Sequence, residues 1–141
     1  MPANSWKLAP GLNNASSYQV SGKPWASGSC HAPKSGSSTL VVRFPAVSKW
    51  VQVLPTGSSA AAGLRIAFSE NGLHNSNFFR VNGGATAAAS VPVDVKVTEL
   101  WFMSDSSAPI TFDIVAGLTS IAIGSAQTAE GPSWSGSAGV N

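Results

Sequence analysis

The side chains that most often do catalytic chemistry are few in this chain of 141 residues, and they are scattered. His31 and His74 lie far apart in sequence, each within a stretch rich in Gly, Ser or Asn that is typical of a loop. A Ser/His/Asp triad could be assembled from the many serines, but none stands in a Gly-x-Ser-x-Gly motif. There is also no phosphate-binding Gly-rich loop followed by Lys-Ser/Thr, and no His-x-x-x-His pair. We therefore predict that the protein is not an enzyme and that it needs no cofactor.

Metal chemistry finds equally little support. Cys30 is the only cysteine, so it cannot form an internal disulfide, and next to His31 it lacks the further ligands that a zinc site needs. Oxygen ligands for calcium could come from one segment, but only one of them is charged, so a turn rich in Asn is the favoured interpretation. These residues are Glu70, Asn71, Asn75 and Asn77. We predict no metal site.

Aromatic residues are the more informative side chains. Spaced aromatics on otherwise polar segments are typical of anchors that dock into grooves, because they bring large contact area at low entropy cost. We predict four such assembly contacts, with folding back onto the same chain as the alternative: Trp6, Tyr18, Trp25 and Trp134. A second set could form a platform for carbohydrate, although aromatics within strands more often pack in the core. This set is Trp50, Trp101 and the pair Phe78–Phe79.

The elements that would position these side chains are strands. Six apolar runs between Ser38 and Thr119 are each ended by turn-forming residues: Thr39–Phe44, Lys49–Leu54, Leu64–Ser69, Asn77–Val81, Val91–Met103 and Ile110–Val115. The third and sixth runs alternate apolar and polar residues with a period of two, which is the pattern of a strand buried on one face. Short strands separated by turns predict an all-β antiparallel sandwich.

Details of the connections are also predicted. Residues 45–49 resemble a short hairpin connection, and Asn71-Gly72 is a strong turn signal. The run Val91–Met103 changes the parity of its apolar residues near Thr98 and Glu99. Either a bulge at that point keeps one face inward, or the strand is buried on both faces.

Outside the sandwich, Gly and Pro interrupt every periodic pattern. We therefore predict three parts: an extended N-terminal arm over residues 1–37, a sandwich over residues 38–119 and a C-terminal arm over residues 120–141. Within the first arm, Ser17–Val20 could add one edge strand.

Composition favours association with other copies or proteins. Charged residues make up only 10% of the chain, against about 25% in an average domain, and a weakly charged surface favours association. Residues 1–69 carry six basic and no acidic residues, whereas residues 70–141 carry two basic and six acidic ones, so that +6 and −4 give the net +2. Because the basic residues are isolated, we expect no specific nucleic-acid recognition. We prefer contact between the basic half of one copy and the acidic half of the next.

Targeting signals are not visible in the sequence. The first twenty residues contain no apolar core of a signal peptide, and no run approaches the roughly 20 apolar residues of a membrane span. We expect the protein to be made inside a reducing cell.

The order of the strand phrases resembles that of a known family. The phrases are Val42–Pro45, Trp50–Val53, Leu64–Gly72, Phe78–Val81, Val95–Phe102 and Phe112–Thr119. They are similar to small single jelly-roll structural proteins of virions, of the penton, minor capsid or head-decoration type. The resemblance implies a subunit of an icosahedral shell, located in the virion, whose partners are copies of itself and other capsid proteins bound through terminal arms. A jelly roll has eight strands, so two more would have to come from division of Val91–Met103 and from the region of Tyr18. The alternative is a carbohydrate-binding sandwich of a fibre or receptor-binding protein.

Overall fold

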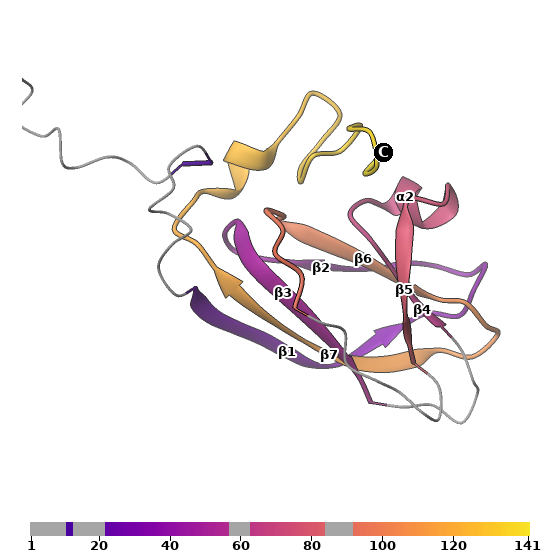
Figure 1. The fold of residues 1–141 in the computed structure, drawn as a ribbon. Helices are drawn as coiled ribbons and strands as arrows, with labels where there is room; N and C mark the ends of the chain where they lie inside the picture. Colours follow the sequence, from indigo (N-terminus) through magenta and orange to yellow (C-terminus); the bar gives the residue numbers. More distant parts are fainter. Residues whose placement is uncertain (1–10, 13–21, 57–62, 84–91) are drawn as a thin grey trace, which may run out of the picture.

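A computed structural model describes residues 11–12, 22–56, 63–83 and 92–141. These residues form two antiparallel sheets that pack face to face, with two short helices beside them (Figure 1). The strands are β1 (Lys23–Ala32), β2 (Leu40–Arg43), β3 (Ser48–Pro55), β4 (Gly63–Ala67), β5 (Phe78–Asn82), β6 (Glu99–Ser104) and β7 (Ile110–Leu118). The helices are α2 (Glu70–His74) and the 3-10 helix η1 (Ile123–Ala126). The prediction of an all-β antiparallel sandwich is confirmed.

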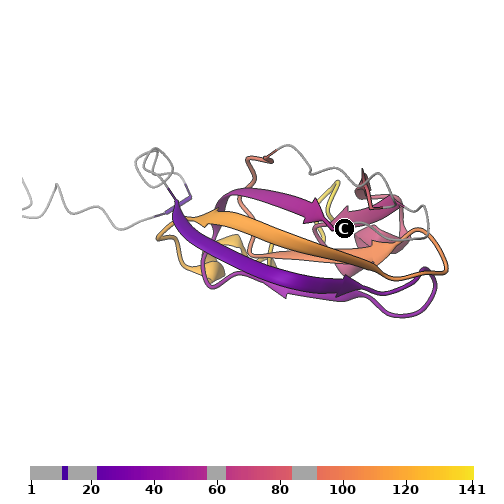
Figure 2. The same ribbon diagram turned by 90° about the horizontal axis from the view of Figure 1, so that it is seen from below.

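The chain crosses repeatedly between the two sheets. Sheet A has the order β1-β7-β3, whose strands run side by side in Figure 2, and sheet B has the order β2-β6-β4-β5. Beyond β3, Val93 continues sheet A through two backbone hydrogen bonds with Val51, of 2.8 and 2.9 Å. Because β2 belongs to sheet B and β3 to sheet A, residues 45–47 lead from one sheet to the other. The prediction of a hairpin between β2 and β3 is wrong.

The core lies between the sheets and follows the predicted alternation. In β7, Ile110, Phe112 and Ile114 are buried while Thr111 and Asp113 are half-exposed. Side chains from both sheets meet there, and the rings of Phe102 and Phe112 lie 4.4 Å apart between centroids. Such interdigitated apolar contact between two sheets is the main source of stability in a sandwich.

The predicted N-terminal arm contains a strand that the sequence pattern concealed. Residues 23–32 form β1, which pairs with β7 along most of its length, so the sandwich begins well before residue 38. A bulge between Ser27 and Cys30 breaks the period of two, and Ser29 there has φ = 54°. Pro24 is accommodated because β1 is an edge strand, where a missing N–H is tolerated. The boundary at residue 37 is therefore corrected.

The predicted C-terminal arm also packs on the body. Ile121 and Ala126 are buried against Val47, and the backbone of Val47 donates to Ile121 O at 3.1 Å. At the far end, Ser69 Oγ donates to Val140 O at 2.5 Å, which holds the last residues next to α2 (Figure 1). Residues 120–141 thus form a cover on this protein's own sandwich.

Two further local predictions are resolved by the structure. Asn71 and Gly72 lie inside α2, which begins because Ser69 Oγ accepts a hydrogen bond from Gly72 N at 3.1 Å. A short helix therefore stands where a turn was predicted, and it joins the antiparallel neighbours β4 and β5. Strand β6 has no bulge in its pairing with β2 or β4. It is buried on both faces: Phe102 points into the core and Met103 packs under α2 with Leu73.

Candidate functional site

Two of the four residues predicted as assembly contacts lie in the described part of the chain, and both make contacts within their own chain. Trp25 is half-buried and its ring meets the ring of Phe44 edge-on, with centroids 4.9 Å apart. The indole of Trp134 donates its Nε1 proton to Lys96 O and packs against the main core. For these two residues, the alternative of folding back onto the same chain describes the structure. Trp6 and Tyr18 lie outside the described residues.

The residues predicted as one carbohydrate platform are distributed over different faces. Trp50 lies on the outer face of sheet A, across Gly117 of β7, where an added Cβ would come within 2.2 Å of the indole Nε1. Trp101 lies on the outer face of sheet B, and Phe79 points between the sheets. These side chains do not form a single surface.

Phe78 packs with Trp101 against the cluster under α2 and also belongs to a charged cluster on sheet B. The guanidinium groups of Arg65 and Arg80 lie 4.6 and 4.7 Å from its ring centroid. Asp105 accepts a hydrogen bond from each of the two arginines. Two cation–π contacts and a shared carboxylate fix this ring in place, which is a structural arrangement that leaves little of Phe78 for a ligand.

A polar groove of about 360 Å³ lies on the outer face of sheet B. Its floor contains the neighbouring side chains of Glu99 and Trp101 on β6, and Arg43 of β2 lies opposite Glu99. One wall is the start of α2, and the other is the C-terminal segment. The wall residues are Ser69, Glu70, Asn71, Glu130, Pro132, Ser135, Gly136 and Asn141.

A second groove, of about 300 Å³, is almost entirely apolar. It runs between the strand-like segment that precedes β6 and the C-terminal segment, and it is lined by Phe68, Val95, Lys96, Val97, Trp134 and Val140. Lys96 Nζ donates to Leu12 O at 3.2 Å, and Leu12 packs on the cluster that also contacts Trp134. Leu12 is therefore held beside Lys96, one of the residues that line this groove.

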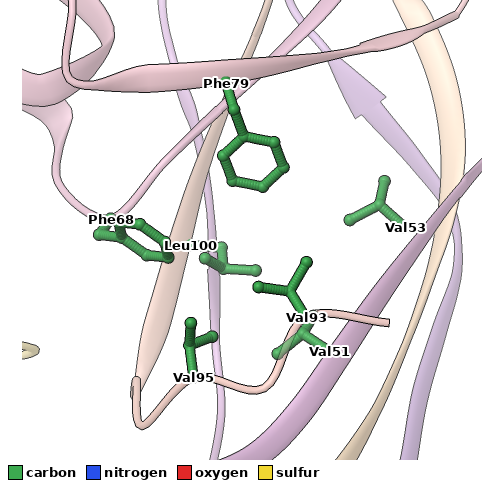
Figure 3. Close-up of a pocket in the computed structure, with 7 residues that line it drawn as sticks. All are labelled: Val51, Val53, Phe68, Phe79, Val93, Val95 and Leu100. Atoms are coloured by element: carbon green, nitrogen blue, oxygen red, sulfur yellow. The ribbon is translucent and has the colours of Figure 1, made fainter. Parts of the chain in front are cut away.

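A third space lies between the sheets at their open edge, where two aromatic rings and several valines point toward one another (Figure 3). Its lining is apolar: Val51, Val53, Phe68, Phe79, Val93, Val95 and Leu100. The cavity measures only about 10 Å³, which is near the lower limit for one water molecule. It is a packing gap and not a ligand pocket.

The side chains considered for catalysis or metal binding do not converge. His31 Nδ1 lies 3.2 Å from Thr111 Oγ1 on sheet A, whereas His74 ends α2 on the other sheet. Glu70 accepts a hydrogen bond from Thr39 Oγ1 at 2.9 Å. Among the described residues, no three His, Cys, Asp or Glu side chains gather closely enough to hold a metal ion.

Two interactions of the site were not foreseen from the sequence. Glu99, with only 6% of its side chain exposed, has Oε2 at 3.2 Å from Arg43 Nε. Its Oε1 accepts a hydrogen bond from Trp101 Nε1 at 3.2 Å. The signal that could have found the pair is the placement of opposite charges at the end of one strand and the start of another, but their pairing depends on sheet order.

Comparisons with known proteins give no relative: no protein-family model, no curated protein and no solved structure matches the chain. Within the described residues, no helix is long and apolar enough to cross a membrane.

Proposed function

We propose that this protein is a structural subunit of a virus capsid, of the penton, minor capsid or decoration type. The observation that supports the proposal most strongly is the strand order. If the segment at Val93 is counted as a strand between β5 and β6, the described part of the chain has eight strands. Numbered along the chain, they then lie in the orders 1-8-3-6 in sheet A and 2-7-4-5 in sheet B.

This order supports a jelly roll as the topology of the proposed subunit, in which eight strands wrap as two Greek keys into two sheets. The two strands missing from the sequence pattern would come from β1 and from division of Val91–Met103 between the sheets. Jelly rolls are the common architecture of capsid subunits, although a fold by itself does not determine a function.

Features of the surface support an assembly role. Lys96, which lines the apolar groove, donates a hydrogen bond to Leu12 O. The sequence shortly before Leu12 carries the large apolar residues Trp6 and Leu8. In the proposal, this segment of one copy docks in the apolar groove of the next. Such a head-to-tail contact is heterologous and closes into a ring if the rotation fits, as a five-fold position requires. The partners are copies of the chain and other capsid proteins, and the mature location is the virion.

Native mass spectrometry of the full chain tests the proposal. The expected result is a closed oligomer that dissociates when residues 1–10 are removed or when Trp6 is replaced by Ala. The matched control is Lys7→Ala, which should leave the oligomer intact because it removes no large apolar side chain. A strict monomer at all concentrations, or an oligomer that is indifferent to Trp6, would count against the arm as the assembly element.

A further inference from the structure

The polar groove on sheet B has a fixed aromatic floor. Trp101 Nε1 donates a hydrogen bond to Glu99, and Glu99 also forms a salt bridge with Arg43. These two interactions restrict rotation of both the indole and the carboxylate. Part of the indole packs against the cluster under α2, and part lines the groove. Since its N–H is already hydrogen-bonded to Glu99, the indole can contact a ligand only through the apolar surface of its ring.

The wall formed by the C-terminal segment is also rigid. Thr128 and Gly131 form a backbone bridge, with Thr128 N donating to Gly131 O at 2.8 Å, and Thr128 Oγ1 donates to Ser135 O at 2.5 Å. Gly136 has φ = +82°, and a Cβ there would come within 2.2 Å of Glu130 Cγ. Glu130 is therefore packed against the backbone of Gly136, which sets where its carboxylate can reach.

The polar groups around the ring are mainly acceptors, with a few donors. Glu70 and Asn71 come from one wall, and Glu130 and Ser135 from the other. Ionised carboxylates only accept hydrogen bonds, whereas the amide of Asn71 both donates and accepts. A ligand that suits this set has several hydroxyl donors around an apolar face. A pyranose has that composition.

The size and charge of the groove narrow the ligand class. A volume of about 360 Å³ lies within the usual range of small-molecule sites, at the lower end that suits one or two sugar rings. Counting Arg43 against Glu70, Glu99 and Glu130 gives a local charge of 1 − 3 = −2. Anionic sugars are therefore disfavoured. We propose that this groove binds a neutral saccharide, with Trp101 as the ring platform and Glu130 as a hydrogen-bond acceptor on the rim.

Saturation-transfer difference NMR on the full chain tests this proposal, because it observes the ligand and works whether or not the copies assemble. The probes are the methyl glycosides of glucose, galactose and mannose, N-acetylglucosamine, and N-acetylneuraminic acid as the anionic contrast. We expect at least one neutral sugar to bind with a dissociation constant of about 1 mM, and the anionic sugar at least about tenfold more weakly.

Variants locate the binding. Trp101→Leu removes the ring platform but keeps an apolar side chain against α2, and Glu130→Gln keeps the shape of the rim; each should weaken binding about tenfold or more. Trp50→Leu on the outer face of sheet A is the matched control and should leave binding unchanged. Three results would overturn the proposal. The first is the absence of saturation transfer at sugar concentrations up to about 50 mM, and the second is equal binding by the Trp101 and Trp50 variants. The third is saturation transfer only to a cationic probe such as lysine methyl ester. None of these outcomes depends on the oligomeric state, so this proposal and the capsid proposal fail separately.

Discussion

The contact between Trp50 and Gly117 gives a sharp prediction about sheet A. Gly117 lies in β7, the central strand of that sheet, and the indole of Trp50 covers the place where a side chain would stand. In Gly117→Ala, the new Cβ would lie 2.2 Å from Nε1 and 2.8 Å from Cδ1 and Cε2. Because non-bonded atoms normally approach to about 3.5 Å, the indole must move by more than about 1 Å.

The expected cost follows from this displacement. Overpacking of a well-packed site lowers the free energy of unfolding by about 1–3 kcal/mol, and we expect Gly117→Ala to fall in that range. In a Trp50→Ala background the three closest contacts of the new Cβ, all with the indole, are removed. There, alanine should raise stability by about 0.5–1 kcal/mol, because glycine in a strand carries an extra entropic cost. The two substitutions should therefore be coupled by about 2 kcal/mol.

Urea unfolding followed by far-ultraviolet circular dichroism measures all four members of this double-mutant cycle without depending on tryptophan fluorescence. Gly124→Ala is the matched control, since a Cβ there meets nothing within 4 Å, and it should leave stability unchanged or raise it by up to about 1 kcal/mol. Gly117→Ala destabilising the protein equally with and without Trp50 would refute the reasoning, because the cost would then come from the backbone.

Three further predictions concern the contacts that close the sandwich. Ser48→Ala should cost about 1–3 kcal/mol in urea unfolding, because Ser48 Oγ is the buried acceptor for Val97 N; an unchanged midpoint would contradict this role. Asp105→Ala should cost about 1–3 kcal/mol by the same assay, since it leaves Arg65 and Arg80 without their shared carboxylate, and a loss below about 0.5 kcal/mol would show that Phe78 alone holds them. Removal of residues 1–37 should abolish cooperative thermal unfolding because it deletes β1, whereas removal of residues 1–10 deletes no described strand and should leave a single cooperative transition; a cooperative transition in both truncated chains would contradict the placement of β1.

Much of the fold was predictable because local patterns decide it. All six apolar runs overlap a strand, and the alternation in Ile110–Val115 directs Ile110, Phe112 and Ile114 inward as expected. Strand β1 was missed because the pattern around Gly28 has no period, and its burial depends on pairing with β7, which lies 78 to 95 residues further along the chain. Pairing at that distance is a property of the whole sheet and leaves no local signal.

The candidate site was harder to predict for the same reason. Trp101 was singled out from its residue type, but its partners Glu99 and Arg43 become neighbours only through the order of sheet B. The turn signal at Asn71-Gly72 failed because Ser69 supplies a helix cap at that point. The C-terminal segment was expected to leave the body, yet its small residues allow it to pack closely against α2, where Ser69 binds Val140.

Electron microscopy of the concentrated full chain tests the capsid proposal most directly. The account predicts closed rings or shells built from sandwich-shaped subunits, with density for a neighbouring chain in the apolar groove lined by Phe68, Trp134 and Val140. Dispersed single subunits, or rings in which that groove stays empty, would contradict it.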